Sequence, residues 1–188
     1  MTKSIMIVGV GGQGSLLAST LLGKLLVTEG YDVKVSEVHG MSQRGGSVVT
    51  YVRFGEKVYS PIIEKGAADC IISFEKLEAA RWVQYLKEGG VIITNTQQID
   101  PMPVVIGAAQ YPEEILTELS QKVKVDALDA LTLANEAGSS RAVNIVLMGR
   151  LARQLSLPYD KWEAALRMVV KPKFVDINLK AFALGYNY

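Results

Sequence analysis

Apolar and polar positions change their period along the chain, and these changes predict alternating strands and helices. Short apolar runs and period-two alternation indicate strands, whereas apolar positions repeated every three to four residues indicate amphipathic helices. The elements expected first are a strand at 4–8, a helix at 14–27, and strands at 33–38, 47–54 and 57–60. The last two strands flank a turn at Gly55-Glu56, so we expect a hairpin there and a mixed sheet.

The next stretch predicts a further β-α-β unit and the end of the sheet. We expect a buried strand at 68–74, a helix at 76–87 stopped by Gly89-Gly90, a strand at 91–95, a helix beginning near Pro112, and a last strand at 123–125. Beyond it the pattern is helical, with helices expected at 130–137, 140–155, 158–170 and 173–184.

These elements together predict the fold class. We expect one α/β domain over residues 1–188 with a Rossmann-like start and a three-layer α/β/α arrangement. Its mixed, mostly parallel sheet is expected over about residues 1–126 and its helical part over about residues 127–188.

The charge balance excludes several classes of partner. The chain has 20 Lys and Arg against 19 Asp and Glu, a formal net charge of +1, which gives no electrostatic basis for binding nucleic acid or an anionic membrane. No uncharged apolar run approaches the roughly 18–20 residues that span a bilayer, so we expect a cytoplasmic protein without membrane contact. Because 49% of the residues are hydrophobic, we expect another chain to cover part of the surface.

The composition also excludes metal chemistry held by this chain alone. One cysteine and one histidine cannot form a disulfide, an iron–sulfur cluster or a structural zinc site. Cys70 lies within the apolar run 68–74, and we interpret it as a small core residue.

Two glycine-rich stretches are the main candidates for function. The first glycine loop, Gly9-Val10-Gly11-Gly12-Gln13-Gly14, and the second glycine loop, His39-Gly40-Met41-Ser42-Gln43-Arg44-Gly45-Gly46, each follow a predicted strand. Glycines at strand ends expose backbone N–H groups, and a helix that begins there adds a positive dipole. The two loops together are expected to form one anion-receiving floor.

The first loop alone leaves several interpretations open. Gly9, Gly11 and Gly14 have the spacing of a dinucleotide fingerprint, and Glu37 lies where a ribose-binding acid would sit in a nicotinamide enzyme. Gln13, however, places a bulky amide inside the turn, and nothing later supplies a hydride-transfer site. A tight strand-to-helix turn without a ligand is the structural alternative. Adenylyl-transferring enzymes related to ubiquitin activation rank third, because the chain lacks their paired Cys-x-x-Cys ligands.

The second loop carries the more specific string. Arg44 offers a guanidinium fork beside Gly45 and Gly46, a combination that suits phosphate, carboxylate or pyrophosphate. A salt bridge or carbonyl clamp that fixes the loop is the alternative for Arg44. His39 is able to donate to a ligand oxygen, although a lone histidine beside glycine is more often a residue whose hydrogen bond organises the turn.

Both loops together resemble the gamma subunit, or gamma domain, of 2-oxoacid:ferredoxin oxidoreductases, above all the small subunit of the indolepyruvate enzymes. The resemblance covers essentially the whole chain. Further matching segments follow in the same order, at residues 60–63, 66–72, 75–79, 95–96, 141–144, 147–149 and 178–182.

The resemblance implies a subunit of an enzyme that oxidatively decarboxylates a 2-oxoacid, forms an acyl-CoA and passes electrons to ferredoxin. It implies that thiamine diphosphate and iron–sulfur clusters belong to partner subunits, that this chain helps to bind coenzyme A, and that it is inactive alone. It assigns no catalytic and no metal-binding residue to this chain. The residues that it places at the subunit junction are Gly11, Gly12, Gln13, Gly14, His39, Arg44, Gly45 and Gly46.

Two other classes of function remain as alternatives. A free-standing Rossmann-like protein would bind NAD or another nucleotide without a partner. A purely structural assembly module would need Arg44 for complex formation and not for coenzyme A. Homodimerisation of the isolated chain stays an open question.

Overall fold

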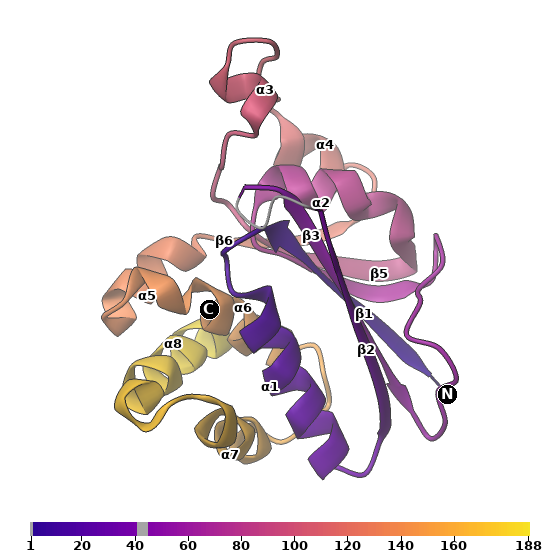
Figure 1. The fold of residues 1–188 in the computed structure, drawn as a ribbon, viewed down its shortest axis with the longest axis vertical. Coiled ribbons are helices and arrows are strands. Elements are labelled where there is room, and N and C mark those ends of the chain that lie inside the picture. Colours follow the sequence, from indigo (N-terminus) through magenta and orange to yellow (C-terminus); the bar gives the residue numbers. More distant parts are fainter. Residues whose placement is uncertain (1, 41–44) are drawn as a thin grey trace.

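The computed structural model describes residues 2–40 and 45–188 and contains a six-stranded sheet (Figure 1). Its strands are β1 (Lys3–Val10), β2 (Asp32–His39), β3 (Ser47–Gly55), β4 (Ala68–Ser73), β5 (Leu86–Asn95) and β6 (Lys124–Leu128). They lie in the order β2-β3-β1-β4-β5-β6; β1, β4, β5 and β6 pair in parallel, while β3 is antiparallel to both of its neighbours. This confirms the mixed, mostly parallel sheet.

Helices cover both faces of the sheet, which confirms the three-layer arrangement (Figure 1). One face carries α1 (Ser15–Thr28), α5 (Ala130–Ala137), α6 (Val143–Ala152), α7 (Tyr159–Val169) and α8 (Val175–Asn187), and the other carries α2 (Lys76–Trp82) and α4 (Ile115–Ser120). A short helix, α3 (Met102–Val105), projects away from the body, and 3-10 turns occupy Val83–Tyr85, Ser140–Ala142 and Pro172–Phe174. None of the helices in the described residues is long and apolar enough to cross a membrane.

The period-two alternation of the strands divides the core into two clusters. Ile5 and Ile7 of β1 pack with α1 and the C-terminal helices, whereas Met6 and Val8 pack with α2 and α4. Cys70 is buried in the first cluster, as expected, and burial raises the pKa of its thiol.

The contact between α6 and α8 depends on two glycines. Gly149 of α6 and Gly185 of α8 sit where a Cβ would meet backbone: 2.2 Å from the Phe182 carbonyl oxygen for Gly149, and 1.9 Å from the Val146 carbonyl oxygen for Gly185. The two helices therefore approach backbone to backbone, and this contact joins the last helix to the sheet-covering layer.

The expected hairpin between 47–54 and 57–60 is wrong. Both edges of β3 are already paired, with β1 on one side and β2 on the other, so no free edge remains for a further strand. The segment after β3 is instead held at the start of β2, where the Val58 N–H donates to Asp32 Oδ2 over 2.9 Å. Lys34 also pairs with Asp32, and these contacts lower the pKa of its carboxyl group.

The helix expected at 76–87 also ends early. It gives way to a 3-10 turn at Val83, and β5 already begins at Leu86 instead of residue 91. Leu86 pairs with Ala68, and the register then shifts before Cys70 pairs with Val91. Gly89 has a φ of +74°, so the Gly89-Gly90 pair accommodates an irregularity inside the strand and does not stop a helix. The sheet ends at Leu128, two residues past the expected boundary at 126.

Candidate functional site

The ladder between β1 and β3 brings the two glycine loops together. Val10, the last residue of β1, lies opposite Ser47, the first residue of β3. The pairing continues past the strands: the Gly11 N–H donates to the Gly46 carbonyl over 2.8 Å, and the Gly45 N–H faces the Gly11 carbonyl at 3.5 Å. The sequence-based expectation that the loops are neighbours is therefore confirmed.

A groove of about 350 Å³ lies where the two loops meet. It is lined by Gly11, Gly12, Gly14, Ser15, Leu16, Glu37, His39 and Val48. Gly12 and Gly14 adopt φ values of +100° and +88°, which residues with a Cβ rarely take. The groove sits at the carboxyl ends of β1 and β2 and at the start of α1, and open α/β sheets bind ligands at the carboxyl ends of strands and the helix N-termini that follow.

Gln13 braces the first loop from within. Its Oε1 accepts the Val10 N–H at 2.7 Å, and its Nε2 donates to the Phe74 carbonyl at 3.0 Å. A Cβ on Gly9 would lie 2.9 Å from this same Oε1. The side-chain amide of Gln13, which was predicted to bind the ligand, therefore hydrogen-bonds to backbone groups on both of its polar atoms, and Gln13 does not line the groove.

Acidic and imidazole side chains enter the groove from the end of β2. The Glu37 carboxylate accepts the hydroxyls of Ser15, at 3.3 Å, and Thr50, at 3.1 Å. His39 is exposed, and its Nδ1 lies 3.2 Å from the Gly40 carbonyl oxygen, a contact of the turn-organising kind. Arg44, the predicted cation of the site, lies outside the described residues.

Asn144 supports the groove from below. This buried side chain donates from Nδ2 to the Gly14 carbonyl at 3.1 Å, and its Oδ1 accepts the Ile145 N–H at 2.9 Å. Both of its polar atoms thus satisfy backbone groups. Farther along the chain, Ser139 caps the turn at 140–142.

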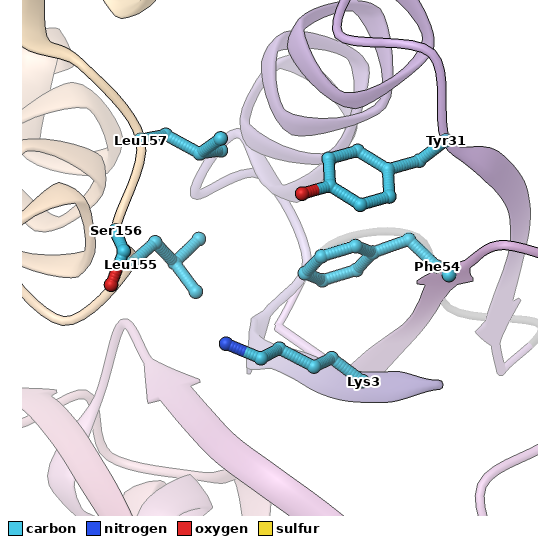
Figure 2. Close-up of a pocket in the computed structure, with 7 residues that line it drawn as sticks. Lys3, Tyr31, Phe54, Leu155, Ser156 and Leu157 are labelled. Carbon is cyan, nitrogen blue, oxygen red and sulfur yellow. The ribbon is translucent and has the colours of Figure 1, made fainter. Parts of the chain in front are cut away.

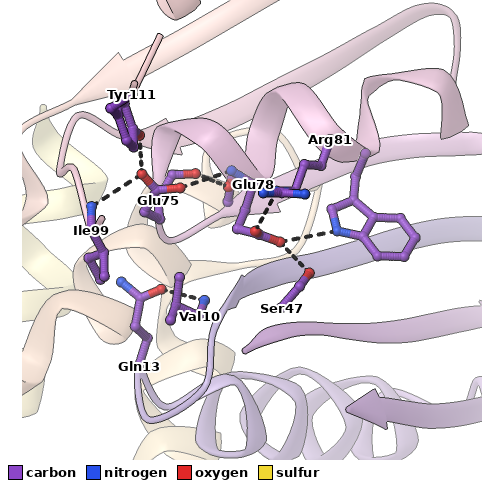
Figure 3. Close-up of polar contacts among 10 residues, drawn as sticks. Val10, Gln13, Ser47, Glu75, Glu78, Arg81, Ile99 and Tyr111 are labelled. Carbon is purple, nitrogen blue, oxygen red and sulfur yellow. Dashed lines mark hydrogen bonds and ion pairs between the residues drawn. The ribbon is translucent and has the colours of Figure 1, made fainter. Parts of the chain in front are cut away.

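Two buried glutamates that the sequence analysis missed, Glu75 and Glu78, lie near Ser47 at the start of β3 (Figure 3). Glu75 caps α2, since its Oε2 accepts the Glu78 N–H at 2.9 Å. Its Oε1 accepts the Ile99 N–H, at 3.3 Å, and the Tyr111 hydroxyl. Residues 99–111, which we call the arm, therefore have both of their ends hydrogen-bonded to the same buried Glu75 carboxylate.

Glu78 connects α2 to the second loop. It accepts the hydroxyl of Ser47, accepts the Trp82 Nε1–H at 3.3 Å, and pairs with Arg81 Nε at 3.1 Å (Figure 3). Burial raises the pKa of Glu78 above its ordinary value, because desolvation outweighs these three contacts. A cavity of about 150 Å³ separates Glu78 from Gly45 and from Pro101 at the base of the arm.

A further pocket opens at the opposite end of β1 and β3 from the groove. It measures about 180 Å³ and is lined mainly by Tyr31, Phe54, Leu155 and Leu157, with the Lys3 side chain at one side (Figure 2). The start of β1 and the end of β3 form it, so it is distant from both glycine loops. None of the predicted site residues lies there, and the described residues contain no cluster of His, Cys, Asp and Glu able to hold a metal ion.

Known proteins match nearly the full chain. The family model for pyruvate ferredoxin/flavodoxin oxidoreductase matches residues 4–188. The chain is 46% identical to the indolepyruvate oxidoreductase subunit IorB of Thermococcus kodakarensis and 48% identical to that of Pyrococcus horikoshii, in each case over 97% of this chain and 93% of the relative.

Solved structures agree at the level of the fold. The gamma subunit of a keto/oxoacid ferredoxin oxidoreductase from Geobacter sulfurreducens has a TM-score of 0.74 at 22% identity and covers 98% of this chain and 96% of its own. A 2-oxoglutarate:ferredoxin oxidoreductase from Magnetococcus marinus, solved with 2-oxoglutarate, coenzyme A and succinyl-CoA, has a TM-score of 0.75 at 19% identity; the match covers 99% of this chain and 30% of that one. The chain therefore belongs to the pyruvate ferredoxin/flavodoxin oxidoreductase family, with the fold of its gamma-type subunits.

Proposed function

We propose that this chain is the gamma-type subunit of an enzyme that oxidatively decarboxylates an aryl pyruvate, with indolepyruvate as the first candidate. The reaction releases CO₂, joins the acyl carbon to the thiol of coenzyme A and passes two electrons to ferredoxin. The identity of 46–48% to subunits of indolepyruvate oxidoreductases over 97% of the chain carries this proposal. The iron–sulfur clusters are assigned to partner subunits because one cysteine cannot ligate a cluster, and thiamine diphosphate is assigned to them on the family resemblance.

The groove supports a role in binding coenzyme A. Glycine N–H groups and the start of α1 suit the phosphates of this ligand. The sequence of the second glycine loop includes Arg44, a residue type that pairs with phosphate. His39 adds a further polar group at the groove. The coenzyme A named for the Magnetococcus enzyme, whose structure shares this fold, agrees with the assignment.

Nucleotide binding by the isolated chain is the second candidate. One observation favours it: Glu37 lines the groove beside the first glycine loop, as a ribose-binding acid would. Its carboxylate already accepts two hydroxyls within the chain, so binding a ribose requires at least one of these contacts to break.

Reconstitution tests the proposal. The isolated chain is expected to show no oxidation of indolepyruvate, and activity with coenzyme A and ferredoxin is expected to appear when the thiamine- and cluster-bearing subunit is co-expressed. Titration calorimetry of the isolated chain with NAD is expected to show no binding at micromolar concentration. An active isolated chain, or micromolar NAD binding by it, would refute the subunit assignment in favour of the second candidate.

The arm offers a surface for this partner. Met102, Val105 and Ile106 are 68%, 66% and 68% exposed, and residues 101–112 include no charged side chain. The arm follows the carboxyl end of β5 and projects from the body (Figure 1), and Pro101 at its base lines the same cavity as Gly45. A partner that completes the groove is therefore within reach of the arm, and an apolar cleft on it would suit the exposed side chains.

The variant Ile106→Asp is expected to weaken binding of the partner subunit more than tenfold, because a charge would replace an apolar side chain at the contact. Affinity is measured by surface plasmon resonance on the co-expressed large subunit. Val27→Asp, at an apolar position on α1 that is 58% exposed, is the matched control and is expected to bind normally. Equal affinities of the two variants would remove the arm from the interface.

A further inference from the structure

The second glycine loop is fixed at its carboxyl end by a side chain of another layer. Ser47 follows Gly45-Gly46 directly, begins β3 and donates its hydroxyl to Glu78 of α2. Its neighbour Val48 points to the other face of the sheet and lines the groove. One residue of β3 therefore contacts the α2 layer while the next one forms the groove wall.

The contact acts on the groove through the backbone. Gly46, which precedes Ser47, accepts the hydrogen bond from Gly11 that joins the two loops. A shift of Ser47 would thus move the Gly46 carbonyl and, with it, the spacing between the first and second loops. Glu78 is held from its own side as well, because Glu75 accepts its N–H and Arg81 and Trp82 contact its carboxylate.

Packing alone gives no reason for an acid at this position. Glu78 is 5% exposed, and an apolar side chain would fill the same space without the cost of removing a charge from water. An apolar residue would lack an acceptor for the Ser47 hydroxyl, for the Trp82 Nε1–H and for the Arg81 guanidinium. Arg81 and Trp82 belong to α2 itself, so Ser47 is the contact among these three that links the acid to β3 and the second glycine loop.

We propose that Glu78 is a positioning residue for the groove: through Ser47 it holds Gly45-Gly46, the carboxyl end of the second glycine loop, against the first glycine loop, in the position at which the groove receives the phosphates of coenzyme A. This inference rests on the proposed function. Glu78 does not line the groove, so its effect reaches the ligand through Ser47 and the backbone of Gly46.

The test uses the complete complex with its partner subunits. Glu78→Ala and Ser47→Ala are each expected to raise the KM for coenzyme A about tenfold, with kcat within twofold of the wild type, since a hydrogen bond to a charged group is lost. Glu78→Gln keeps an oxygen acceptor and is expected to restore most of the affinity. The double variant is expected to match the single ones, because both remove one interaction. Glu118→Gln, an exposed acid of α4, serves as the control.

A second readout does not depend on activity. Amide hydrogen exchange of the peptide covering residues 45–54 is expected to be faster in Glu78→Ala and Ser47→Ala than in the control. Ser47→Ala alone decides the outcome if Glu78→Ala fails to fold. An unchanged KM for coenzyme A in Ser47→Ala, or additive effects in the double variant, would overturn the inference.

The two failures are distinguishable. If the wild-type complex neither oxidises an aryl pyruvate nor requires coenzyme A, the proposed function fails, and with it coenzyme A as the ligand of the groove. If the wild-type complex is active and the variants alter only its melting temperature, the proposed function stands and Glu78 is solely a structural residue.

Discussion

Replacing Gly185 with alanine is expected to destabilise the protein strongly, although the change adds only one methyl group. The new Cβ would lie 1.9 Å from the Val146 carbonyl oxygen, and backbone cannot yield as a side-chain end does. Separating α8 from α6 is expected to cost about 3 kcal/mol of unfolding free energy and to lower the melting temperature by roughly 10 °C. Thermal and urea denaturation followed by circular dichroism measure both quantities.

Gly23→Ala provides the matched control within another helix. A Cβ on Gly23 of α1 would meet only Val35 Cγ2, at 3.8 Å, an ordinary contact. Because alanine favours helix over glycine by about 0.5–1 kcal/mol, this variant is expected to be slightly more stable than the wild type. If Gly185→Ala melted as Gly23→Ala does, the close approach of α6 and α8 would be incorrect.

The second large effect is expected on ligand binding when a negative charge enters the groove at Gly12. Among the described residues, and apart from the chain neighbours of Gly12, no atom lies within 4 Å of a Cβ built there, so the Cβ of Gly12→Asp meets open space. In the complete complex this variant is expected to raise the KM for coenzyme A about five- to thirtyfold above that of Gly12→Asn, because a carboxylate beside a phosphate is unfavourable by about 1–2 kcal/mol. Steady-state kinetics at low ionic strength measure the ratio.

The comparison with Gly12→Asn isolates charge from backbone strain. Both variants must adopt the φ of +100° found at Gly12, and their side chains have nearly the same shape. The ratio between them is expected to shrink as salt is added, since the interaction is electrostatic and exposed. A ratio near one at low salt would mean that no anionic group binds at the first glycine loop.

Sequence patterns located most of the helices but extended the one at 76–87 too far, missed the short α3 and predicted one strand pairing that is wrong. The helix at 130–137 has the expected bounds, because its period is local and Asp129 and Gly138 mark its ends. The wrong hairpin followed from the same reliance on local signals: β3 pairs with β2, which precedes it, and with β1, which lies far earlier in the chain. Such non-local pairing leaves no mark in the spacing of hydrophobic residues.

The part of the candidate site formed by the two glycine loops could be predicted from the sequence. Their position after strands placed Gly11 near Gly46, and the hydrogen bonds confirm this. Gln13 and Glu78 show what the pattern could not tell. A polar residue in a turn and an acid in a short helix are both typical of positions that face solvent. The structure shows instead that Gln13 donates to the Phe74 carbonyl and that Glu78 accepts the Ser47 hydroxyl.

The continuation of the β1–β3 ladder into both glycine loops has a consequence for engineering. The spacing of the two loops at the groove is set by main-chain hydrogen bonds that join Gly11 to Gly46 and to Gly45, at the distance common to neighbouring strands of a sheet. Side chains around it can thus be exchanged for new ligands without redesigning the frame. An insertion in β1 or β3, by contrast, would shift the register between these strands and displace one glycine loop relative to the other. Variant libraries that aim to change the bound cofactor should therefore use substitutions and keep the loop lengths unchanged.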